Sequence, residues 1–199
     1  MDRGQNIKEV SMKGQDIVVL LKLISLQKNE ETGGGRLVIR DSSEEQVYSV
    51  RGLETSLGIS KSEIHNSINR SIFSGLGIKD YATTRIRPNN RIVYNFIVHG
   101  LKYVFPVKPG SITRGVPTMF AAPMLKGLLV SPGEYINVWP HAEGESMGHA
   151  VEPLFKSVPG AVQEDQFLYE CLALIDAIRL GKPREAGLAA ELLAERILK

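Results

Sequence analysis

Residues 48–73 read YSVRGLETSLGISKSEIHNSINRSIF, and this stretch predicts two short helices joined by a tight turn. Ser49 is suited to cap the first helix, because its hydroxyl can accept a bond from a backbone N–H of the first turn. Gly58 can end that helix after Leu57 in the left-handed conformation that glycine adopts without strain. The pattern therefore predicts a helix up to Leu57 and a turn directly after it.

The second helix is expected to begin near Lys61, since Ser60 and Glu63 have the Ser-x-x-Glu spacing of a capping box. Isoleucines recur every four residues along it, so one side should pack inward against the first helix. These are Ile64, Ile68 and Ile72. The opposite side is left facing outward with Lys61, Ser62, His65, Asn66, Asn69 and Arg70.

These outward side chains are of the types that read DNA. Asn pairs with adenine, Lys or Arg with guanine, and Ser with several bases or with phosphate. Arg70 lies further along the helix and is expected to contact phosphate. The residues predicted to bind double-stranded DNA are Ser60, Lys61, Ser62, His65, Asn66, Asn69, Arg70, Arg85 and Arg87. The alternative is a solvated helix face in another kind of small α/β domain.

The N-terminal half resembles the winged helix-turn-helix of bacterial transcriptional regulators, loosely of the MarR type. The resemblance rests on a preceding helix expected over 14–27, on the run VRGLETSLGISKSEIH at 50–65, and on a wing. It implies a sequence-specific DNA-binding domain over 12–107. A dimer of such domains reads a palindromic operator, with one helix of each subunit in the major groove.

The wing is expected from a hairpin whose strands cover 102–107 and 112–120, with Pro109-Gly110 as its turn. A helix over 90–99 is expected before it. This order departs from a conventional winged helix, in which the wing follows the reading helix at once.

The remainder is expected to be an irregular connector over 108–160 and a helical hairpin over 161–199. The two helices of the hairpin are predicted at 164–180 and 183–198, because Gly181 breaks the first and Pro183 starts the second. Their apolar stripes suit dimerisation or the binding of a partner protein. The predicted fold class is α+β and mainly helical.

Composition limits the class of protein. The chain has 199 residues, 43% hydrophobic and 23% charged, which is typical of a globular protein. A net charge of +2 is too small to indicate nucleic acid without a local basic region. The single cysteine excludes an internal disulfide framework and favours a reducing cytoplasm. No apolar run is long enough to span a membrane, so no membrane partner is expected.

A catalytic or metal site is not predicted. His141, Glu143, Glu145 and His149 are ligand types within one loop, but no Cys joins them, and loops rich in Gly and Glu are usually only solvated. Cys171 lies on an apolar helical stripe, where a thiol is normally inert packing. We therefore expect no cofactor and no enzymatic activity, although a small enzyme using this loop is a third hypothesis.

The sequence thus supports two main hypotheses. The first is a homodimeric, sequence-specific DNA-binding regulator that reads its operator with residues 61–73. The second is an antitoxin-like or accessory module that binds a partner protein through residues 108–199, because some 90 residues are more than dimerisation requires.

Overall fold

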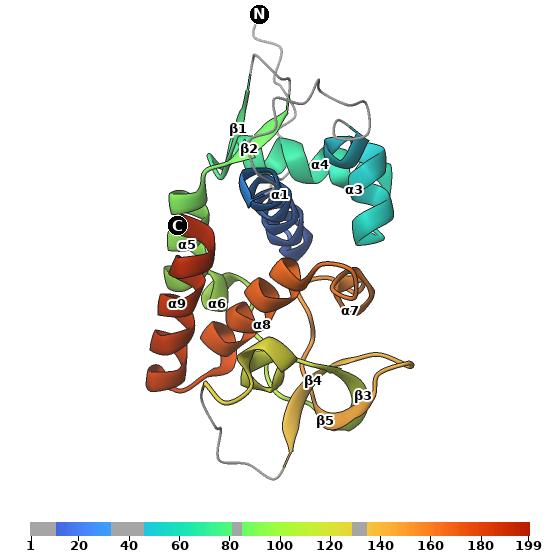
Figure 1. Cartoon of the computed structure of the whole chain (residues 1–199), viewed down its shortest axis with the longest axis vertical. Helices are drawn as coiled ribbons and strands as arrows, with labels where there is room; N and C mark the ends of the chain where they lie inside the picture. Colours follow the sequence, from blue (N-terminus) through green and yellow to red (C-terminus); the bar gives the residue numbers. More distant parts are fainter. Residues whose placement is uncertain (1–10, 33–45, 81–84, 129–134) are drawn as a thin grey trace, which may run out of the picture.

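The computed structural model describes residues 11–32, 46–80, 85–128 and 135–199, and its architecture is α+β and mainly helical (Figure 1). The N-terminal half contains α1 (Gly14–Thr32), α3 (Val50–Leu57), α4 (Lys61–Phe73), β1 (Gly77–Lys79) and β2 (Ile86–Pro88). The C-terminal half contains α5 (Asn90–His99), α6 (Leu101–Val104), β3 (Ile112–Pro117), η1 (Met119–Ala121), η2 (Pro123–Leu125), β4 (Ile136–Pro140), β5 (Ser146–Ala150), α7 (Val158–Ala161), α8 (Gln166–Leu180) and α9 (Pro183–Leu198).

Helix α1 lies between the rest of the N-terminal half and the C-terminal half, and residues 15–21 near its start are buried on every side, whereas residues 29–31 near its end are exposed. The run from Ile17 to Leu21 is at most 1% exposed. A helix that is apolar all round belongs in the interior. On one side α1 packs on α4, and on the other it meets the start of α8, where Lys22 and Ser25 both bond the Asp165 carboxylate. One hydrophobic core therefore runs through the whole chain.

The turn between α3 and α4 forms as the sequence predicts. The Ser49 hydroxyl accepts a bond from the N–H of Gly52, and Gly58 has φ 62° in the left-handed region. The predicted capping box is wrong, although α4 begins at Lys61 as expected. The Ser60 hydroxyl makes no cap bond, and the Glu63 carboxylate instead accepts bonds from the side chains of Gln15 and Lys13 on the α1 side.

The buried face of α4 also differs from the prediction. Ile64, Ser67 and Ser71 are buried, whereas Ile72 is 36% exposed. Two serines on the packed face leave room for α1 to approach closely, so the buried stripe is rotated away from the four-residue isoleucine repeat. The inward position predicted for Ile72 is therefore wrong.

A two-stranded hairpin follows α4 directly. Strands β1 and β2 are antiparallel, with Ile78 opposite Arg87 and Lys79 opposite Ile86. The predicted hairpin over 102–107 and 112–120 is wrong, although its second strand is present as β3, which pairs with β4 and β5. Residues 101–104 form helix α6 instead, a short helical continuation after α5, which itself has its predicted bounds.

The segment predicted to be an irregular connector contains a small closed barrel. Strand β3 pairs antiparallel with both β4 and β5, and β4 and β5 pair parallel to each other. Such a narrow barrel needs positions without a side chain. A Cβ on Gly115 would lie 2.0 Å from the carbonyl oxygen of Trp139, and one on Gly144 would lie 2.4 Å or less from the backbone of Gly115.

Helices α8 and α9 form the predicted hairpin, packed against each other. Most of their apolar residues are buried within the chain and not free for a partner, although Leu188 and Leu192 of α9 are only partly buried. Every residue from Cys171 to Ile178 of α8 is buried. The surface expected to support dimerisation or partner binding is thus already covered by α1, the barrel and the short helices around η1.

Helix α8 contains a buried ion pair. The side chains of Asp176 and Arg179 are 2% and 4% exposed and lie 2.7 Å apart. The other Asp176 oxygen accepts bonds from Trp139 Nε1 at 2.6 Å and Thr118 Oγ1 at 2.9 Å. Arg179 also donates to the carbonyl oxygen of Phe105. This network fixes the barrel to α8.

Within the described part of the chain, no helix combines the length and apolar character needed to cross a membrane.

Candidate nucleic-acid interface

The outward face of α4 carries a compact group of polar side chains. Ser62, His65, Asn66 and Asn69 are all exposed. Their spacing of i, i+3, i+4 and i+7 places them on one side of the helix. The structure therefore brings together the central residues that the sequence predicted to read bases.

The first residues of this surface lie at the turn. Ser60 and Lys61 are exposed, and the Lys61 amine lies 3.8 Å from the carboxylate of Glu54 on α3. The side chain of Lys61 is 60% exposed, so this contact is a solvent-screened one that contributes little to stability. The amine can exchange Glu54 for an anionic ligand such as a phosphate.

Arg70 does not join this surface, although the sequence assigned it to a phosphate. Its Nε and Nη2 atoms donate to the two carboxylate oxygens of Asp16 at 2.8 and 2.6 Å. The Arg70 side chain is only 13% exposed, and Asp16 is completely buried. The hydrogen bonds from Arg70 to Asp16 hold the pKa of the guanidinium above its usual value.

This ion pair locks α4 onto α1. Asp16 also accepts a bond from the backbone N–H of Lys13, so its carboxylate joins the first turn of α1 to the last turn of α4. A second link joins Glu63 to Gln15 and Lys13, and the bond from Gln15 is the main reason why the pKa of Glu63 is lowered. These contacts hold α4 in a fixed position on α1, while its outward face stays exposed.

The two arginines after α4 have different environments. Arg87 is exposed on β2, opposite Ile78. Arg85 instead lies over the ring of Tyr48 at 4.3 Å and pairs with Glu30 at 3.2 Å. Arg87 is therefore the freer of these two predicted DNA-binding residues, and Arg85 ties the start of β2 to the segment before α3 and to the end of α1.

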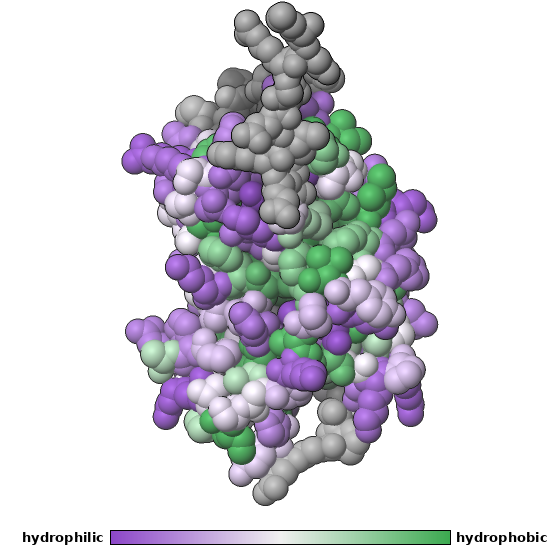
Figure 2. Space-filling model, turned by 180° about the vertical axis from the view of Figure 1, so that it is seen from behind, coloured by the Kyte–Doolittle hydropathy of each residue, from purple (hydrophilic) through white to green (hydrophobic). Residues whose placement is uncertain are grey.

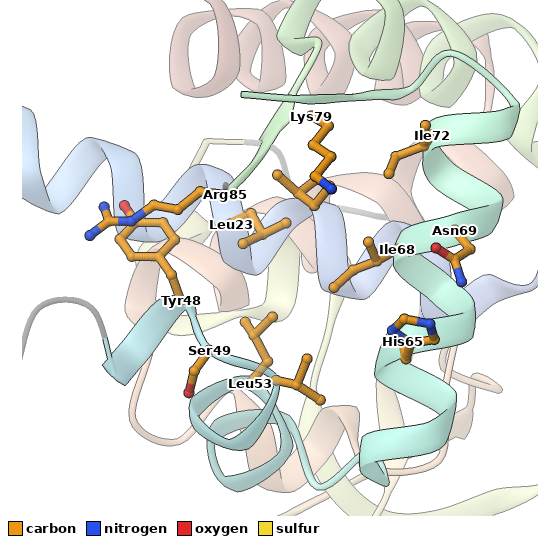
Figure 3. Close-up of a pocket in the computed structure, with 12 residues that line it drawn as sticks. Leu23, Tyr48, Ser49, Leu53, His65, Ile68, Asn69, Ile72, Lys79 and Arg85 are labelled. Atoms are coloured by element: carbon orange, nitrogen blue, oxygen red, sulfur yellow. The ribbon is translucent and has the colours of Figure 1, made fainter. Parts of the chain in front are cut away.

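A groove of about 420 Å³ separates α4 from the hairpin and the start of α3 (Figure 3). Its wall includes Leu23, Leu53, Ile68 and Ile86, while His65, Asn69, Lys79 and Arg85 bring polar groups to it. The sequence analysis did not include Lys79 among the candidates. In the sequence, Lys79 stands out only as a basic residue soon after the predicted reading helix. Its position beside the groove becomes clear only from the structure, in which β1 lies next to α4.

The described residues contain no group of three or more His, Cys, Asp or Glu side chains suited to a metal ion. His141 directly follows β4, whereas His149 lies within β5, and the His149 ring packs edge-on against Tyr135. Cys171 is completely buried, and this burial raises the pKa of its thiol well above the ordinary value.

Comparisons of the chain with protein-family models, with curated proteins and with solved structures found no match. The functional interpretation therefore depends on the geometry of this surface.

Proposed function

We propose that the protein is a sequence-specific DNA-binding transcriptional regulator. The observation that carries this proposal is the exposed stripe of Ser62, His65, Asn66 and Asn69 on a helix whose other sides are packed or ion-paired. Side chains of these types pair with base edges in the major groove. A solvated surface helix has no need for such bracing.

In this proposal the N-terminal half is a winged helix-turn-helix. Helices α3 and α4 are the two helices of the motif, α4 is the reading helix, and the β1–β2 hairpin is the wing. The order of helix, helix, helix and hairpin supports it, because the wing then follows the reading helix without an intervening element. Arg87 and Lys79 are exposed on this hairpin and are suited to contact phosphates beside the groove.

A mobility-shift titration with the DNA upstream of the protein's own coding sequence tests the proposal. Binding should be specific over random competitor DNA, and it should weaken steeply as salt rises, because phosphate contacts release counterions. A Lys79→Ala, Arg87→Ala double variant should lower the affinity for all duplexes and reduce the salt slope by about 2. The absence of a specific complex at low salt would contradict the proposal.

A homodimer on a palindromic operator remains part of the proposal, but the helical hairpin no longer provides its surface. The stoichiometry of the complex, measured by analytical ultracentrifugation with one and two half-sites, decides this point. Two chains on the palindrome, and still two when one half-site is destroyed, support a dimer, whereas one chain on the single half-site shows that monomers bind independently.

The second candidate is an antitoxin-like or accessory module, and one surface favours it. Ile112, Tyr135, Ile136 and Met147 on the barrel are 40–52% exposed, and apolar side chains are visible at the lower end of the molecule in Figure 2. Ile112 lies opposite His149 of β5, and the Tyr135 ring packs edge-on against the His149 ring, so Ile112 and Tyr135 lie on the same side of this strand. Exposed apolar clusters often mark protein interfaces. Affinity purification of the wild type beside an Ile112→Ser, Tyr135→Ser variant tests this: loss of one stoichiometric partner supports it, and the same proteins with both chains contradict it.

A further inference from the structure

The outward line of α4 does not end with its polar side chains. Ser62, Asn66, Asn69 and Phe73 follow one another at intervals of four, three and four residues, which keeps them in one row along the helix. Phe73 is 75% exposed, and Ile78 at the start of the hairpin is 56% exposed. The row therefore changes from hydrogen-bonding groups to an apolar aromatic ring.

The row also lacks the usual readers of guanine. Guanine is most often read by Arg or Lys. Arg70 is the one arginine in the sequence of α4, and its guanidinium is held by Asp16. Lys61 stands at the first position of the helix beside Glu54. Between Ser62 and Phe73, the outward face of α4 thus presents amides, a hydroxyl, an imidazole and a ring, but no guanidinium or ammonium.

We infer that α4 recognises an A·T-rich half-site, an assignment that rests on the proposed DNA-binding function. In it, Asn66 binds the N6 and N7 groups of an adenine, and the Phe73 ring contacts the C5-methyl group of a thymine. Asparagine has the geometry for a bidentate bond to adenine, and phenylalanine is among the residues that contact the thymine methyl.

The geometry also gives a spacing. Asn66 and Phe73 are seven residues apart, which is about 10 Å along a helix with a rise of 1.5 Å per residue. Successive base pairs are about 3.4 Å apart. The adenine and the thymine should therefore lie about three base pairs from each other within one half-site.

The first experiment selects duplexes for the full-length protein from a random pool. The expected product is an A·T-rich half-site that contains an adenine and a thymine at this spacing. If no duplex is enriched, the proposed DNA-binding function fails, and this inference fails with it. If the enriched half-site is rich in G·C, the protein binds DNA as proposed but the inference is overturned.

The second experiment replaces single atoms of the selected duplex and measures affinity by fluorescence anisotropy. Replacing the thymine by deoxyuridine removes only the methyl group and should weaken wild-type binding roughly fourfold, as expected for one buried methyl. Replacing the adenine by 7-deazaadenine should weaken it about tenfold. Phe73→Ala should lose the sensitivity to deoxyuridine alone, and Asn66→Ala the sensitivity to 7-deazaadenine alone.

Matched variants show whether the loss of any exposed ring or amide has the same effect on binding. Phe73→Leu should keep part of the methyl sensitivity. Tyr103→Ala removes a similarly exposed aromatic ring, and Asn95→Ala removes an exposed amide from α5, so both should bind as the wild type does. Because Phe73 and Asn66 are exposed, their variants should unfold at the wild-type urea concentration. If Phe73→Ala or Asn66→Ala keeps wild-type sensitivity to its base analogue, the assignment of that side chain is wrong.

Discussion

Replacing Arg70 by Ala should destabilise the protein rather than remove a phosphate contact. The change deletes both bonds to Asp16 and leaves that carboxylate, which is 0% exposed, with only the Lys13 N–H as a partner. Breaking a buried pair in this way costs about 3–5 kcal/mol. Because the Arg70 side chain is 13% exposed and water reaches part of it, we expect the lower end, about 3 kcal/mol.

The partner variant should cost less. Asp16→Ala leaves Arg70 without its carboxylate, but the guanidinium can turn toward water or toward Glu63, which already lies 4.0 Å away. We expect a loss of about 2 kcal/mol, which includes the bond from Lys13. Urea unfolding of wild type, both single variants and the double variant completes the cycle. The double variant should lose at least about 1.5 kcal/mol less than the sum of the single losses.

An exposed arginine provides the control. Arg91→Ala at the start of α5 should change the free energy of unfolding by less than about 0.5 kcal/mol. The reasoning is refuted if Arg70→Ala unfolds at the wild-type urea concentration. If in addition its affinity falls equally for all duplexes, Arg70 contacts phosphate after all.

Further predictions concern the C-terminal half. Cys171 should not react with a thiol reagent at pH 8 until urea unfolds the chain, because it is buried and its pKa is raised; fast labelling of the native protein would contradict this. Gly115→Ala should prevent the barrel from closing and cost at least about 3 kcal/mol, whereas Gly187→Ala in α9, where a Cβ meets nothing within 4 Å, should stabilise by up to about 1 kcal/mol; thermal melting of both variants decides it. Trp139→Phe should lose about 1–3 kcal/mol in urea unfolding, since Asp176 loses a buried donor, and an unchanged midpoint would show that this bond contributes little.

Local signals predicted the helices well. Ser49 and Gly58 bound α3 as their capping chemistry requires, and Gly181 and Pro183 mark the junction of α8 and α9. The exposure of Ser62, His65, Asn66 and Asn69 followed from helical periodicity and the choice of polar types. In these cases the interactions that form the element join residues that are close together in the sequence. They can therefore be predicted from the sequence alone.

The failures involve contacts between distant residues. Asp16 and Arg70 are 54 positions apart, and only the packing of α1 on α4 reveals that they pair. The three-residue strands β1 and β2 are too short for an alternating pattern, and they form because residues 77–79 and 86–88 meet as a hairpin. The barrel depends on crossings at Gly115 and Gly144, which in sequence read only as loop glycines. The sequence also indicates a short strand over 36–40, and this segment lies outside the described residues.

The position of α1 has a consequence for whether the N-terminal half could evolve as a separate domain. Because this helix is a wall of both halves and bonds to Asp165 at the start of α8, a fragment ending near residue 107 would leave one side of its own central helix bare. The N-terminal half is therefore not a transferable module that recombination could graft onto another chain. Residues of the N-terminal half that contact α8 should therefore coevolve with it. Substitutions in α8 that strengthen the shared core should also lengthen the lifetime of the folded α4.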